Sequence, residues 1–230
     1  MRRTALALVL LAAAPFAAGG TLAERIGRLA PGLDPHVADL ALQALRCATG
    51  QAPEHAARRL AVIDYSKPST AQRLWVFDLR QPALLYVEHV THGSGSGENH
   101  TTRFSNRPGS HQTSLGLFRT SETYTGRNGY SLRLDGLDKG FNDRARERAI
   151  VMHGVPYVNE DIIRTMGRLG RSQGCPAVRE AVEAPLIDSI KDGQYVFAYY
   201  PDQEWLQRSA LLSCPVAQMA AATPQASPAL

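Results

Sequence analysis

The feature that most constrains the fold is a series of short runs, rich in β-branched and aromatic residues, between residues 60 and 200. Each run has five to seven residues and is bounded by Pro, Gly, Asn or Ser, which is typical of strands joined by turns. We expect strands at residues 60–65, 74–79, 84–90, 115–120, 130–134, 149–153 and 195–200. With 44% hydrophobic residues among 230, the chain can bury a real core, so a wholly disordered or disulfide-dense chain is excluded.

Helices are predicted on both sides of this series. Asp34-Pro35 combines an N-cap residue with proline at the first helical position, and Gly50 marks the end of that helix. Asn159 caps a second helix, and a third is expected at residues 181–191, before Gly193. The predicted fold is mainly β with α: one β-sandwich or barrel domain with a helical N-terminal segment and two inserted helices.

The first 20 residues predict a secretory signal peptide. A basic start (Arg2, Arg3) precedes an apolar run at residues 5–18, which ends in Gly19-Gly20. An uncleaved anchor is disfavoured by Pro15 and by the short apolar run, because a spanning helix needs about 20 apolar residues. We therefore expect cleavage, no stable membrane insertion afterwards, and a periplasmic or other extracytoplasmic location.

Four segments follow from these patterns. The signal peptide (1–20) precedes a helical segment (21–59), the β-rich domain (60–205) and a C-terminal extension (206–230) whose Ala/Pro/Ser-rich end is expected to be disordered. The net charge of +4 falls to +2 without the two arginines of the leader. Such a weak charge gives no reason to expect nucleic acid as a partner.

The strongest chemical signal is a cysteine in a polar, glycine-containing loop. Cys175 follows Gly174 in the stretch Gly170–Pro176, which is not the apolar context of a structural cysteine. Twenty-two residues earlier, His153 ends a predicted strand and precedes Gly154. An imidazole beside a thiol can supply the nucleophilic thiolate, so the two predict a catalytic pair. The alternative is a buried thiol and an unrelated histidine.

At these residues the sequence resembles a known family. Val151-Met152-His153-Gly154 and Ser172-Gln173-Gly174-Cys175-Pro176 are similar to the signature of the YkuD-type murein L,D-transpeptidases, in a divergent branch. The resemblance spans residues 60–200 and implies an L,D-transpeptidase-like domain at 60–205. It also implies a reaction without cofactor or metal, in which the cysteine attacks an L-centred residue of a peptidoglycan stem peptide. D-alanine leaves, and an amine or water resolves the thioester.

The resemblance assigns a role to each matched residue. Cys175 corresponds to the nucleophile and His153 to the base, whose ring is oriented by the backbone carbonyl of Gly154. Backbone N–H groups around Gly174 and Cys175 correspond to the oxyanion hole. Ser172 is expected to shape the loop rather than to attack the substrate.

One position departs from the family. Many relatives carry an arginine two residues after the cysteine, where this chain has Ala177. Arg171 and Arg179 are the nearest substitutes for binding a substrate carboxylate. His92, at the start of a glycine-rich loop, either lines the substrate cleft or shapes that loop. Histidines 89, 92, 100 and 111 have spacings that match no compact zinc motif, so no metal site is predicted.

Three other functions use or reinterpret the same residues. An L,D-carboxypeptidase or endopeptidase would transfer the acyl group to water, and sequence does not separate it from a transpeptidase. A sortase-like enzyme also places histidine before cysteine, but Ser172-Gln173-Gly174 fits its pattern poorly. A non-catalytic wall-binding module predicts the loss of Cys175 or His153, and both are present.

The remaining cysteines are Cys47 and Cys214. An oxidising compartment favours their pairing, because the proposed chemistry needs Cys175 free. Both also border apolar sequence, so two separate buried thiols are the alternative.

Overall fold

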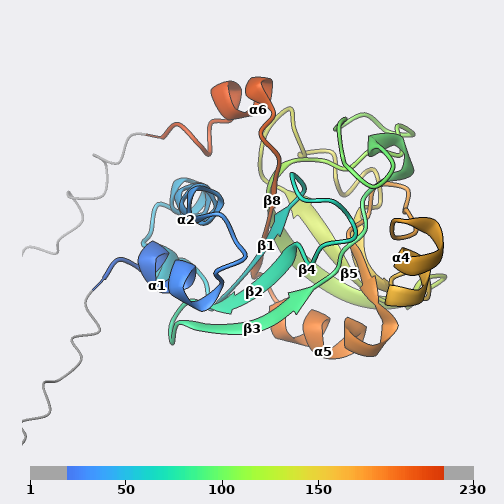
Figure 1. Ribbon diagram of the computed structural model, residues 1–230. Helices are drawn as coiled ribbons and strands as arrows, with labels where there is room; N and C mark the ends of the chain where they lie inside the picture. The colour runs from blue at the N-terminus through green and yellow to red at the C-terminus, as the bar shows by residue number, and fades with distance from the viewer. Residues whose placement is uncertain (1–19, 215–230) are drawn as a thin grey trace, which may run out of the picture.

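The computed structural model describes residues 20–214, so most of the predicted leader and the tail beyond residue 214 lie outside the described residues. Its strands form one eight-stranded sheet in the order β3-β2-β1-β8-β4-β5-β6-β7 (Figure 1). The strands are β1 (Arg59–Asp64), β2 (Leu74–Asp78), β3 (Ala83–Glu88), β4 (Gly116–Gly126), β5 (Gly129–Gly136), β6 (Val151–Val155), β7 (Ala177–Arg179) and β8 (Tyr195–Tyr199). Neighbours are antiparallel except for the pairs β1–β8 and β6–β7.

The helices lie before, between and after the strands. They are α1 (Leu22–Leu29), α2 (Pro35–Thr49), α3 (Pro53–Ala56), the 3-10 turn η1 (Ser94–Ser96), α4 (Glu160–Met166), α5 (Glu180–Ile190) and α6 (Gln203–Arg208). The helix predicted from Asp34-Pro35 to Gly50 is confirmed as α2: the Asp34 side chain accepts from the backbone N–H of His36, and Gly50 closes the helix at φ 65°. No helix in residues 20–214 is long and apolar enough to cross a membrane.

All seven predicted strands are present, and apart from the end of β4 their bounds lie within two residues of those expected. β4 continues to Gly126, well past the predicted end, because the irregularity between Thr120 and Thr123 shifts the register and pairing with β5 then resumes. β7 was not predicted, because three residues carry no periodic pattern.

The two ends of the strand order meet and nearly close the sheet into a barrel. Beyond β3, the N–H of Thr91 donates to the carbonyl of Ala177 on β7 at 2.9 Å, and the N–H of Ala177 donates to the Thr91 hydroxyl at 3.0 Å. Arg179 on β7 binds the Glu88 carboxylate through two nitrogens at 2.7 and 2.8 Å. We call these contacts the seam. The predicted mainly β fold is confirmed, in its barrel form.

Apolar side chains are buried on both faces of the sheet. Along β1, Leu60 and Val62 pack with α1 and α2 in one cluster, whereas Ala61 and Ile63 pack with α5 in another. Figure 1 shows α1 and α2 on one side of the sheet and α5 on the other. The N-terminal helices therefore share a core with the β-rich domain.

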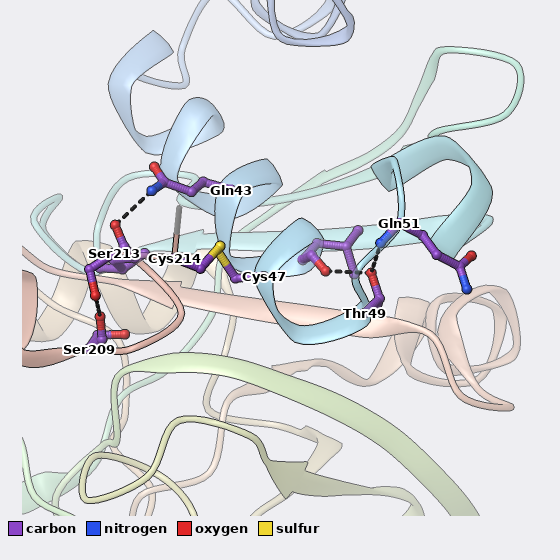
Figure 2. Close-up of a disulfide and its surroundings, with 9 residues drawn as sticks. Gln43, Cys47, Thr49, Gln51, Ser209, Ser213 and Cys214 are labelled. Carbon is purple, nitrogen blue, oxygen red and sulfur yellow. Dashed lines mark hydrogen bonds between the residues drawn. A yellow bond between two sulfur atoms is a disulfide. The ribbon is translucent and has the colours of Figure 1, made fainter. Parts of the chain in front are cut away.

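A disulfide joins Cys47 on α2 to Cys214 (Figure 2). Their Cα atoms are 5.8 Å apart, and one turn earlier on α2 the Gln43 amide donates to the carbonyl of Leu212 at 2.7 Å. The predicted pairing is confirmed, and the alternative of two separate thiols is wrong. Of the three cysteines, Cys175 alone is free.

Candidate active site

A cavity of about 500 Å³ lies in front of Cys175 and His153. His153 is on β6, and Ala177 opposes it on the parallel strand β7. Cys175 lies two residues before Ala177, so the strand pairing brings the thiol and the imidazole to the same cavity. This is how a pair 22 residues apart in sequence comes to share one site.

The surroundings of Cys175 keep it protonated at rest. Its Sγ is 3.8 Å from the carbonyl oxygen of Ala149. Burial raises the pKa of the thiol above its ordinary value, although the N–H of Val151 and the charge of Arg148 partly oppose this. The resting sulfur is therefore a thiol rather than a thiolate.

His153 is nearly fully buried and held by its own strand. Its Nδ1–H donates to the carbonyl of Gly154 at 3.1 Å, which leaves Nε2 as the acceptor. Burial lowers the pKa of the imidazole, against the Gly154 hydrogen bond and the negative charge of Glu183. The ring is therefore neutral near pH 7. A neutral base and a neutral thiol that line one cavity suit proton transfer during attack, not a preformed ion pair.

The loop that carries the thiol is shaped by Ser172. Its hydroxyl donates to the carbonyl of Cys175 at 2.7 Å and accepts from the N–H of Gly174 at 3.1 Å. Gly174 has φ 120°, and a Cβ there would lie 2.8 Å from the Gln112 carbonyl, so the position requires glycine. The Gly174 N–H donates to the Ser172 hydroxyl. It is therefore not free to act as the oxyanion donor that the resemblance predicts. The N–H of Cys175 has no hydrogen-bond partner within residues 20–214.

The two predicted substrate-binding arginines lie in different places. Arg171 lines the cavity and binds the Glu98 carboxylate at 2.7 Å. Arg179 is not part of the cavity wall, because it belongs to the seam with Glu88. Ala177, where relatives carry an arginine, is fully buried.

His92 does not line the cavity. It is fully buried, its Nδ1 accepts from Arg73 at 2.8 Å, and burial together with the Arg73 charge lowers its pKa to about 4. The glycine-rich loop that it begins packs against the cysteine loop. A Cβ on Gly93 would lie 2.2 Å from the His111 carbonyl and 3.0 Å from Gly174. Of the two roles expected for His92, these contacts favour loop shaping, which stays a prediction.

The residues of the cavity wall that sequence reasoning missed include His111, Arg148 and Ala149, and also Arg127. His111 and Ala149 have left-handed φ values of 54° and 53°, which are uncommon for residues other than glycine and cluster at functional sites. Arg148 ends a run of alternating charges that reads as a solvated surface in sequence. No local pattern indicated any of these residues.

Comparisons with known proteins agree with the sequence resemblance. A family model described as L,D-transpeptidase catalytic domain matches residues 29–199. Similar solved structures include an L,D-transpeptidase from Mycobacterium smegmatis, with 14% identity, a TM-score of 0.39, and coverage of 63% of this chain and 59% of that one. The helical cell shape determining protein Pgp2 from Campylobacter jejuni has 11% identity, a TM-score of 0.42, and coverage of 63% and 48%.

L,D-transpeptidase 1 from Mycobacterium tuberculosis has 13% identity, a TM-score of 0.36, and coverage of 62% of each chain. This chain thus spans less than two thirds of the length of each of these three structures. No match is found among curated protein sequences. The family model covers most of the chain, including both His153 and Cys175, and on this basis the protein belongs to the L,D-transpeptidase catalytic domain family.

Proposed function

We propose that the protein is an exported cysteine L,D-transpeptidase that acts on peptidoglycan stem peptides through a thioester on Cys175. The observation that supports this most directly is that the free thiol and His153 line one cavity. The Nδ1 of His153 is engaged by Gly154, which leaves Nε2 available as the base.

The reaction begins at Cys175. Nε2 of His153 takes the thiol proton while the sulfur attacks the carbonyl carbon of the L-centred residue in the donor peptide. The C–N bond to D-alanine then breaks, the imidazolium returns the proton to the leaving amine, and the thioester remains. The N–H of Cys175, which has no hydrogen-bond partner within residues 20–214, serves as the backbone donor for the developing oxyanion.

The second half of the reaction transfers the acyl group. The acceptor amine attacks the thioester, His153 takes its proton, and the thiol of Cys175 is restored. A second cavity of about 380 Å³, lined by Gly154, Tyr157, Glu180 and Glu183, adjoins the first and shares His153 with it. Space for a second peptide beside the base favours an amine acceptor over water, which would give the L,D-carboxypeptidase or endopeptidase reaction.

Incubation with purified tetrapeptide muropeptides and mass analysis tests this function. The protein without residues 1–20 should give products joined between two diaminopimelates, and Cys175→Ala should give none. Tripeptides alone would instead establish hydrolysis. Binding of muropeptides without turnover would establish a wall-binding module.

Covalent capture tests the nucleophile independently. A carbapenem should add to the wild type and fail to add to Cys175→Ala, as read by intact-protein mass. An adduct that persists in Cys175→Ala would contradict the assignment of Cys175.

A further inference from the structure

The cavity in front of Cys175 has an unbalanced charge. Three arginines (127, 148 and 171) and two histidines (111 and 153) contribute to its wall, and no Asp or Glu does. Because a cavity lined by one sign of charge concentrates ligands of the other sign, the wall favours an anion.

The three arginines differ in how their charge is balanced. Arg171 forms an ion pair with Glu98, whose carboxylate also binds Arg168 at 3.0 Å. Arg127, in the turn between β4 and β5, is exposed, and no ion pair or side-chain hydrogen bond of this residue is formed within residues 20–214. Arg127 and Arg148 thus differ from Arg171, because neither has a carboxylate partner in that part of the chain.

Arg148 is a fixed cation held entirely by neutral oxygen atoms. Its Nη1 donates to the Ser105 carbonyl at 2.6 Å and to the Ser114 hydroxyl, and its Nη2 donates to the Gln112 carbonyl and to the Ser110 hydroxyl. These contacts leave its Nε–H without a hydrogen-bond partner among the described residues. The side chain is immobilised, but its charge is not cancelled.

This cation lies directly beside the nucleophile loop. A Cβ built on Gly174 would be 3.3 Å from Nη2 of Arg148. The charge of Arg148 also favours the anionic form of the Cys175 thiol. Negative charge placed next to the sulfur therefore meets a guanidinium that is already in position and partly desolvated.

We propose that Arg148 and Arg127 make this cavity selective for an acyl donor that carries a carboxylate close to the bond that Cys175 attacks. The inference rests on the proposed function, for which it names the recognised group of the donor. Arg148 provides the fixed charge at the nucleophile, and Arg127 provides an exposed charge on the cavity wall. They take the role expected of Arg171 and Arg179, whose guanidinium groups already bind the carboxylates of Glu98 and Glu88.

Two alkylating reagents of nearly the same size test this selectivity without any peptide. Iodoacetate is an anion and iodoacetamide is neutral, and in the unreduced protein Cys175 is the free thiol for both. The rate constant for iodoacetate divided by that for iodoacetamide reports the electrostatic potential at the sulfur. We expect Arg148→Gln and Arg127→Gln each to lower this ratio about three- to tenfold.

The control is Arg164→Gln on α4. It removes the same charge from an exposed side chain that is paired with Asp161, and should leave the ratio unchanged. Arg127 lies in an exposed turn, so its variant tests the proposal even if Arg148→Gln does not fold, as judged by circular dichroism. An unchanged ratio in folded Arg127→Gln and Arg148→Gln would overturn the proposal, as would an equal fall in Arg171→Gln.

The assay also separates this inference from the proposed function. A ratio that responds as expected, in a protein that leaves muropeptides unchanged, would support the anion-selective cavity and contradict the peptidoglycan substrate. Turnover of muropeptides with an unresponsive ratio would contradict the anion-selective cavity alone.

Discussion

Glu183 on α5 accepts a hydrogen bond from the backbone N–H of Gly154 at 2.6 Å, on the strand that carries His153. The same residue, Gly154, offers its carbonyl to the imidazole. A carboxylate on a helix thus fixes the residue that orients the base. Gly154 is required here, because a Cβ would lie 2.9 Å from the Glu183 side chain.

Removing this carboxylate should make His153 a weaker base. The charge of Glu183 raises the pKa of His153, so Glu183→Ala should lower that pKa further, as measured by NMR titration of the ring. Glu183→Gln should lower it as well while keeping a hydrogen-bond acceptor for Gly154. Glu180→Gln on the same helix is the control, and an equal shift in it would contradict a specific role for Glu183.

Turnover, which depends on His153, and alkylation of Cys175 should depend differently on pH. Burial lowers the pKa of His153, so turnover should rise as pH increases through a value below 6.5 and then level off, because the neutral ring is the active base. Burial raises the pKa of the Cys175 thiol above 9.0, so alkylation by iodoacetamide should still be rising at pH 9. An alkylation plateau near neutral pH would instead indicate a resting ion pair.

His92 should make the fold sensitive to acid. Its pKa is lowered from 6.5 to about 4 in the folded protein, so the unfolded chain takes up this proton first as the pH falls. The stability is complete above pH 6.5 and decreases toward pH 4, by about 3 kcal/mol in total. Urea unfolding at several pH values should show a smaller decrease in His92→Asn. The exposed His36→Asn should behave as the wild type does.

Arg179→Gln should act on stability rather than on substrate affinity. It leaves the carboxylate of Glu88, which is 7% exposed, without its cation. Because Arg179 itself is half-exposed, the loss should be modest, about 1–2 kcal/mol in urea unfolding. A raised KM with unchanged stability would contradict this role and indicate that Arg179 binds the substrate.

The disulfide should contribute measurably to stability. It links residues 167 positions apart, and loss of a disulfide typically costs about 2–4 kcal/mol. Cys47→Ser and Cys214→Ser should each lower the free energy of unfolding by that amount, and the double variant should lose no more than either. In the unfolded, unreduced wild type, thiol titration should find one group per chain.

Much of the fold is readable from local sequence. Seven strands and α2 were predicted because alternation and capping are local signals, as at Asp34 and Gly50. β7 escaped prediction because it is held by partners on both sides, not by its own three residues. The seam could not be predicted from sequence either, because Glu88 and Arg179 are far apart in the chain and meet only when the barrel closes.

The site divides in the same way. His153 and Cys175 stand out in sequence, because chemistry needs those residue types and glycine neighbours. Arg148 does not stand out in sequence, because its position in the site depends on hydrogen bonds to a serine hydroxyl and a carbonyl group from distant parts of the chain. The sequence left two roles open for His92, because its contact with Arg73, 19 residues away, leaves no mark on the local pattern.

The seam has a consequence for when the protein becomes reactive. It joins Thr91 to Ala177 across 86 positions, and contacts that distant form late because the chain must first lose loop entropy. The glycine-rich loop that follows Thr91 and packs against Gly174 depends on that closure. In a nascent chain whose local hairpins have formed but whose seam is open, the Cys175 thiol would be exposed and the cavity around it incomplete. A change in the reactivity of Cys175 would therefore report the completion of folding.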